Sequence, residues 1–145
     1  MTTDAGIRVI ICGSRTFEDE EFLFSKMDEI HARTPISLVI EGECDVTEIN
    51  ADKLGRKWAE SRGIEVLPFP TEVSVKIRRS AGPIRNNKML REGHPDLVVA
   101  FIDQMLSTSR GTSHMISIAE RAKVPHQVHM NLPGKGEVSI DSEHE

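Results

Sequence analysis

The stretch Ile7–Arg15 reads IRVIICGSR, a short β-branched apolar run followed by a glycine, a hydroxyl residue and a cation. The run Ile7–Cys12 is too short for a typical helix and too rich in β-branched residues, so it predicts a buried strand. The residues that follow, Gly13, Ser14 and Arg15, can present backbone N–H groups and a positive charge to a phosphate. This stretch therefore predicts the first strand of an α/β fold with a candidate ligand-binding turn at its carboxyl end.

Four more apolar runs of the same kind follow along the chain, and helical patterns separate them. These runs predict strands at Ile36–Glu41, Ile64–Phe69, Asp96–Ile102 and Val124–Met130. The helical patterns predict four helices. The first runs from about Asp19 to His31, and the second runs from a capping box at Asp45 and Glu48 to Gly63. The third is Ile84–Arg91 with Pro83 in its first position, and the fourth runs from about Thr112 to Lys123. Alternation of strands and helices predicts a doubly wound, five-stranded parallel sheet with helices on both faces.

The composition is that of one ordinary domain without a membrane span. The chain has 145 residues and a formal net charge of −5, and it contains no apolar run approaching the roughly 18 residues that cross a bilayer. We expect a single domain over residues 1–130 and an acidic, flexible tail over 131–145. The N-terminus has no signal-peptide pattern, which predicts a cytoplasmic protein, and Cys12 and Cys44 have no zinc or disulfide spacing. The acidic balance argues against a broad nucleic-acid surface.

Ligands of open parallel sheets bind beyond the carboxyl ends of the strands, so four loops are candidates. Three of them offer small residues, hydroxyls and arginines that suit a phosphate, whereas the loop after the second strand offers acids. The ligand-binding residues predicted from these loops are Gly13, Ser14, Arg15, Gly42, Glu43, Arg79, Gly82, Arg85, Asn86, Ser109, Arg110, Gly111 and Thr112. Phosphate donors on three sides and acids on the fourth predict a nucleotide site.

Residues 76–91 hold six of the eighteen Lys and Arg residues and no acid. Arg85 is expected in the first turn of its helix, where the helix dipole disfavours a cation and an anionic partner would offset the cost. Lys76, Arg78 and Arg79 fit either a solvated loop or a lid over the ligand. Lys88 and Arg91 fit an exposed helix face. The cluster therefore predicts one or two cations in the site among solvated neighbours.

Three motifs together resemble the YspA-like branch of the SLOG superfamily: VIICGSRTFED at 9–19, AGPIRNNKML at 81–90 and SRGTSHMISIAERAKVP at 109–125. The resemblance runs from about Ile7 to Val128. It implies a Rossmann-like fold with strand order 3-2-1-4-5, a pocket for a nucleotide or nucleotide-derived molecule, and pairing of subunits through helices. Relatives implied by it include the Lonely Guy phosphoribohydrolases and the DNA-processing protein DprA.

Two features depart from that family pattern. The family's glycine-rich second loop is longer here, with Glu43 and Asn50 in place of two glycines. The phosphoribohydrolase glutamate is replaced by Met115, and a thioether cannot stabilise an oxocarbenium-like centre. Hydrolysis is therefore expected to fail unless Glu43, Asp45 or Asp103 supplies the carboxylate.

The main prediction is a binding module that senses or sequesters a nucleotide-derived molecule without turnover, as a homodimer or higher assembly. The first alternative is an N-glycoside hydrolase that uses Glu43 or Asp45, and the second is single-stranded DNA binding. The second is disfavoured because aromatic residues are 4% of the chain and there is no Tyr to stack on bases. The histidines show no metal-ligand spacing, so no metal and no cofactor are expected.

Overall fold

One sheet of six strands forms the centre of the molecule in the computed structural model, with strand order β3-β2-β1-β4-β5-β6. The structure describes residues 6–43, 47–70, 78–104, 109–132 and 136–142. The elements are β1 Ile7–Gly13, α1 Glu20–Arg33, β2 Ile36–Glu41, α2 Ala51–Ser61, β3 Glu65–Pro68, α3 Arg78–Gly93, β4 Leu97–Ile102, α4 Arg110–Arg121, β5 His126–Leu132 and β6 Gly136–Asp141. None of the helices in the described ranges is both long and apolar enough to cross a bilayer.

Strands β1 to β5 are parallel and have the expected Rossmann-like order, but the expected count of five strands is wrong. A sixth strand, β6, pairs antiparallel with β5 from Leu132↔Gly136 to Gln127↔Asp141. It lies inside the segment 131–145 that the sequence analysis assigns to a tail outside the domain. The alternation Glu137-Val138-Ser139-Ile140 has the period of a strand, and the acids beside it obscured that signal.

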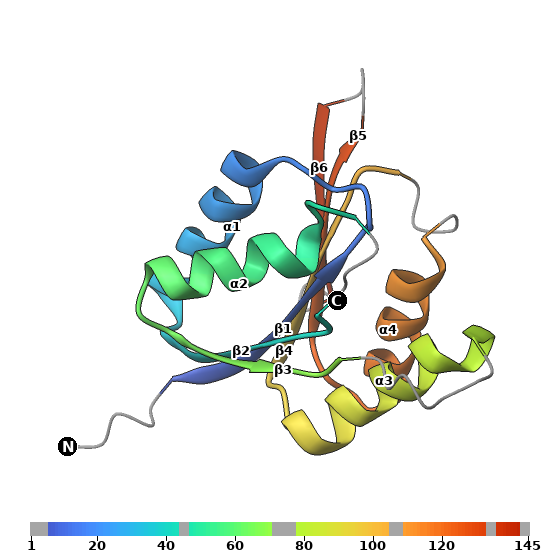
Figure 1. Ribbon diagram of the computed structural model, residues 1–145. Coiled ribbons are helices and arrows are strands. Elements are labelled where there is room, and N and C mark those ends of the chain that lie inside the picture. Colours follow the sequence, from blue (N-terminus) through green and yellow to red (C-terminus); the bar gives the residue numbers. More distant parts are fainter. Residues whose placement is uncertain (1–5, 44–46, 71–77, 105–108, 133–135, 143–145) are drawn as a thin grey trace.

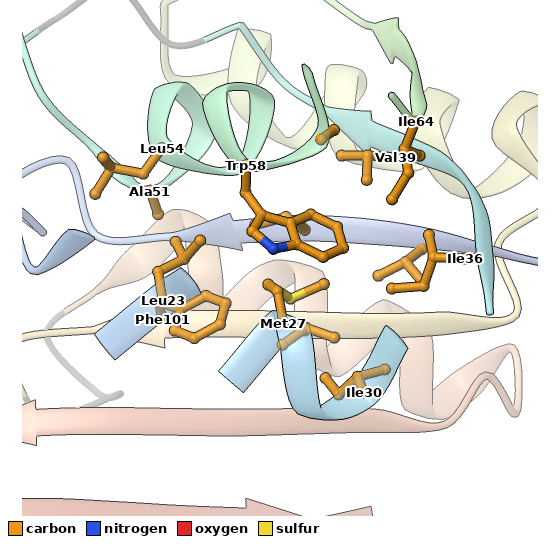
Figure 2. Close-up of a cluster of buried hydrophobic side chains, with 14 of the residues drawn as sticks. Leu23, Met27, Ile30, Ile36, Val39, Ala51, Leu54, Trp58, Ile64 and Phe101 are labelled. Atoms are coloured by element: carbon orange, nitrogen blue, oxygen red, sulfur yellow. The ribbon is translucent and has the colours of Figure 1, made fainter. Parts of the chain in front are cut away.

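The two faces of the sheet carry separate hydrophobic cores, and the helices cover both faces (Figure 1). Val9 and Ile11 of β1 pack with α1 and α2, whereas Ile10, between them, packs on the opposite side with α3 and α4. In the first core Trp58 is fully buried and reaches from α2 toward Met27 of α1 (Figure 2). Because both faces of the central strands are buried, these strands read as continuous apolar runs.

Three helices begin at other residues than expected. The N-cap of α2 is Asn50, whose side chain accepts from the N–H of Lys53, and not the expected capping box at Asp45 and Glu48. Helix α4 begins at Arg110 instead of near Thr112. Helix α3 begins at Arg78, so Pro83 lies inside the helix and not in its first position. Arg85 is therefore two turns from the N-terminus of α3, and the expected clash with the helix dipole does not arise.

Candidate functional site

The turn after β1 is tied tightly to the end of β4. The N–H of Ser14 donates to the carbonyl of Phe101 at 3.0 Å, and the Ser14 hydroxyl accepts from the N–H of Asp103 at 3.3 Å. A Cβ on Gly13 would lie 1.9 Å from the Phe101 carbonyl oxygen. The turn therefore requires glycine, and the hydroxyl of Ser14, which is 2% exposed, holds two loops together.

The N-terminus of α2 is docked against the same turn. The N–H of Ala51, the first residue of α2, points to the carbonyl of Ser14 at 3.4 Å. The Asn50 side chain satisfies the N–H of Lys53 at 2.9 Å, as an N-cap does. This arrangement directs the positive end of a helix dipole toward the carboxyl edge of the sheet.

Arg85 of α3 lies directly on the backbone of Gly42, at the end of β2. Its Nη1 donates to the Gly42 carbonyl at 3.2 Å, and its Nη2 donates to Oδ1 of Asn86 at 3.3 Å. A Cβ on Gly42 would lie 2.9 Å from the guanidinium carbon, so the absence of a side chain there makes room for the cation. These two contacts fix the orientation of the guanidinium beside the β2 turn.

Asn86 joins α3 to the first turn of α4. Its Nδ2 donates to the carbonyl of Gly111 at 3.2 Å and lies 3.1 Å from Nδ1 of His114. The side chain is 3% exposed. Burial lowers the pKa of His114, and the charge of Arg121 lowers it further, which favours the neutral ring that can accept from Asn86. Asn86 therefore positions the loop and helix around the candidate site.

The other predicted residues are distributed unequally. Ser109 and Thr112 are buried and bonded to each other through their hydroxyls at 2.9 Å, whereas Arg15, Arg110 and Gly111 are exposed. Gly82 is half-buried in α3, with open space where a Cβ would lie. Arg79 lies in the first turn of α3, but its side chain is outside the described part of the structure, as is all of Asp45.

Glu41, which the sequence analysis did not single out, is a fully buried acid at the end of β2. Its Oε2 accepts from Nε and Nη2 of Arg56 at 3.1 and 2.9 Å, and its Oε1 accepts from the N–H of Glu43 at 2.6 Å. Glu43 has a positive φ of 52° and lies 3.5 Å from Arg56. The buried ion pair therefore holds the turn that carries Gly42. The available signal was an acid that ends an otherwise apolar strand.

Burial shifts the protonation of two side chains beside this turn. Burial raises the pKa of Glu41 to about 7, although Arg56 and the N–H of Glu43 act in the opposite direction. Burial also raises the pKa of the Cys12 thiol, and the charge of Asp52 adds to the increase while that of Arg85 opposes it. Cys12 is therefore a neutral thiol at physiological pH and not a nucleophile.

Replacing Glu41 by glutamine is expected to change how stability depends on pH. The folded protein binds more protons at Glu41 than the unfolded chain between pH 4.5 and about 7, so the contribution of Glu41 to wild-type stability should fall as pH rises through that window. The shift corresponds to about 3 kcal/mol. Urea unfolding should show Glu41→Gln gaining about that much relative to wild type between pH 4 and 8.

A comparison of variants is required because His129 titrates in the opposite sense. Burial lowers the pKa of His129 to about 4, so its contribution to stability is present above pH 6.5 and is lost as pH falls toward 4. The two trends oppose each other in wild type. Both proteins contain His129, so its contribution cancels when the free energy of unfolding of wild type is subtracted from that of Glu41→Gln at each pH. Glu21→Gln, which removes an exposed carboxyl group, is the control for the loss of one negative charge. If the difference in free energy of unfolding between Glu41→Gln and wild type did not change with pH, the raised pKa of Glu41 would be contradicted.

Four side chains bear on the expected loss of hydrolysis. Met115, which the resemblance aligns with the phosphoribohydrolase glutamate, is 1% exposed and packs in the core beneath α4. Asp103 accepts from the hydroxyl of Thr16 at 2.9 and 3.0 Å. Both oxygens of Glu41 are occupied, whereas the side chain of Glu43 is 33% exposed. Within the described ranges no group of three His, Cys, Asp or Glu side chains could hold a metal ion.

Two hollows lie beside the helices, and the second is lined by His114, the residue that contacts Asn86. One of about 430 Å³ lies between α1 and the β5–β6 pair, and one of about 610 Å³ lies between α3 and α4. Neither is lined by a predicted ligand-binding residue. The candidate site is instead the carboxyl edge of the sheet, where the β1 turn, the N-terminus of α2 and the contact of Arg85 with Gly42 lie.

Comparison with known proteins gives two matches. Residues 7–74 match the family model described as the YspA, cpYpsA-related SLOG family. The chain is also 32% identical over 124 residues to the "Gene 61 protein" of Mycobacterium phage D29, an alignment that covers 81% of this chain and 92% of the phage protein. The family match includes the β1 turn, Gly42 and the N-terminus of α2, which are three parts of the candidate site.

Proposed function

The chain belongs to the YspA, cpYpsA-related SLOG family, and on that premise we propose that it binds a nucleotide or nucleotide-derived small molecule without turning it over. The observation that carries the proposal is the placement of Arg85 against Gly42, beside the strand ends where the N-terminus of α2 also docks. A fixed guanidinium and a helix N-terminus are two of the standard protein partners of phosphate. Family membership points to nucleotide-related ligands, and this geometry supports a phosphate at Arg85.

The positions of the described carboxylates support binding without turnover. Cleavage of an N-glycosidic bond requires an acid that reaches the oxocarbenium-like centre. Met115 replaces the family glutamate and is buried, and Glu41 is fully engaged by Arg56 and Glu43. Glu43 is the exposed acid of the β2 turn, and its carboxylate can accept from ribose hydroxyls. We therefore assign Glu43 to ligand binding and not to catalysis.

Single-stranded DNA binding is disfavoured by the position of the aromatic rings. Phe17, Phe22, Phe69, Phe101 and Trp58 are all at most 8% exposed, and Phe24 is partly buried against the same core as Trp58. Proteins that hold single strands without sequence preference stack the bases on exposed aromatic side chains. The six aromatic residues of this chain are needed for the core instead.

Calorimetry and product analysis separate these functions. Titration with AMP, ADP-ribose, NAD and cyclic nucleotides should give saturable heat for at least one compound, and chromatography of the recovered mixture should show that compound intact. Release of ribose 5-phosphate over hours would show that the protein hydrolyses the nucleotide and would contradict binding without turnover. Retention of single-stranded DNA in a gel shift at about 150 mM salt, without nucleotide binding, would replace it with the DNA function.

A further inference from the structure

β6 is an edge strand with an open side. Among the described strands it pairs with β5 alone, and it ends the strand order. An edge strand presents a row of backbone N–H and C=O groups to which another strand can bond. Charged residues on an edge strand usually oppose such pairing, and β6 carries Glu137 and Asp141. The rest of β6, however, does not have the composition of a protected edge.

The apolar residues of β6 lie together on one face. Val138 is 44% exposed and Ile140 is 53% exposed, and they are two of the four large hydrophobic side chains exposed in the described ranges. Ser139 bonds His129 through its hydroxyl at 2.6 Å, and His129 stacks on Phe101 of the α1–α2 core. Since side chains alternate along a strand, Val138 and Ile140 point to the opposite face, which α3 and α4 cover.

Val138 and Ile140 extend the apolar face of the sheet beneath α3 and α4 outward to a solvent-exposed strand. Val128 and Met130 on β5 are the cross-strand partners of Ile140 and Val138, and both belong to the hydrophobic cluster beneath α3 and α4. The apolar strip therefore extends from the buried interior of the sheet to its outermost strand. Strips of this kind on an open edge are typical of surfaces that another strand covers.

We propose that β6 pairs with β6 of a second copy of this chain, antiparallel across a two-fold axis, so that the two sheets become one. A two-fold axis perpendicular to the sheet keeps each face of the strand on the same side, because side chains directly opposite each other share a face. When the two-fold axis passes through Val138, Ser139 or Ile140, Val138 or Ile140 of one copy lies opposite one of these two residues of the other copy, on the same face. The surface is therefore complementary to itself.

Charge on the other face supports the same occupant. The hollow between α1 and β6 is lined by the cations Lys26 and Arg33 and by the acids Glu29 and Asp141. A second copy brings its own Glu137 and Asp141 to that face, where Lys26 and Arg33 can offset part of the repulsion between acidic strands. Because a pair of six-residue strands buries less than the 1,200–2,000 Å² of stable complexes, we expect a Kd on the order of 10–100 µM.

The test is the oligomeric state of the full chain. Sedimentation between about 5 µM and 1 mM should show reversible dimerisation in the Kd range above. Amide hydrogen exchange at residues 136–141 should slow as protein concentration rises, because the open side of β6 becomes bonded. The double variant Val138→Thr/Ile140→Thr retains residues with good strand propensity and should weaken the dimer at least tenfold.

Ile84→Thr is a matched control. Ile84 is 52% exposed, almost the same as Ile140, but it lies on α3. Its replacement should leave the dimer unchanged if pairing is through β6. A dimer lost in Ile84→Thr and kept in the double variant would assign pairing to helices and overturn the proposal. A protein that stays monomeric to 1 mM, or β6 exchange independent of concentration, would also overturn it. Nucleotide calorimetry on the double variant should match wild type, so the proposed function is tested separately.

Discussion

Replacement of Gly13 by alanine is expected to cost about 4 kcal/mol or more, which is most of the stability of an ordinary domain. The new Cβ would lie 1.9 Å from the Phe101 carbonyl oxygen and 2.7 Å from the Cβ of Ala51. Neither can move away freely, because Phe101 is fully buried in β4 and Ala51 begins α2. Urea unfolding monitored by circular dichroism should show little folded protein at 25 °C, or a midpoint far below that of wild type.

Gly82→Ala is the control for that experiment. Gly82 lies in α3 with open space where a Cβ would be, and alanine is favoured over glycine within a helix by about 1 kcal/mol. This variant should therefore be as stable as wild type or more stable. If Gly13→Ala unfolded at the same urea concentration as Gly82→Ala, the close approach of β1 to β4 described here would be incorrect.

Replacement of Arg85 by alanine is expected to reduce nucleotide affinity by about tenfold to a hundredfold. Hydrogen bonds to charged groups contribute about 1.5–3 kcal/mol, and the Arg85 guanidinium lies against the backbone of the β2 turn at the Gly42 carbonyl. Calorimetry with the nucleotide that wild type binds best measures the loss. Arg85→Lys keeps the charge but loses the fork geometry, so it should recover only part of the affinity.

Arg91→Ala controls for the loss of charge in the same helix. Arg91 is exposed near the C-terminal end of α3, and it should be dispensable for binding. Unfolding of Arg85→Ala must also be measured, since its contacts to Gly42 and Asn86 stabilise the β2 turn. Equal affinity in wild type and a folded Arg85→Ala variant would remove Arg85 from the site.

The five parallel strands could be predicted because their sequence signal is local. Residues 38–40 of β2 and Leu97–Ile102 are buried on both faces of the sheet, so each is a continuous stretch of apolar residues. The sixth strand is different. β6 is exposed along almost its whole length, and its position depends on pairing with β5, which composition does not reveal. The acids that suggested a tail are tolerated because an edge strand can keep charged side chains in water.

Helix starts and buried polar contacts were less predictable. Proline is common in the first turn of helices, but α3 begins at Arg78, five residues before Pro83. Similarly, Asp45 and Glu48 have the spacing of a capping box, whereas the N-cap of α2 is Asn50. The position of Arg85 against Gly42 and the buried pair of Glu41 with Arg56 join residues far apart in sequence. Such contacts follow from tertiary packing, which no local pattern encodes.

A nitrogen-edited NMR titration of the wild-type chain with the same panel of nucleotides tests the central claim most directly. The claim is that the carboxyl edge of the sheet binds a nucleotide-derived anion. With at least one compound, the backbone amide signals of Ser14, Gly42 and Gly111 and the side-chain signal of Arg85 should shift in a saturable way. Backbone signals of Leu90, Ile118 and Ala122, which line the hollow between α3 and α4, should stay in place. If no compound shifts the site signals, or if the shifts gather at that hollow, the account of the site is wrong.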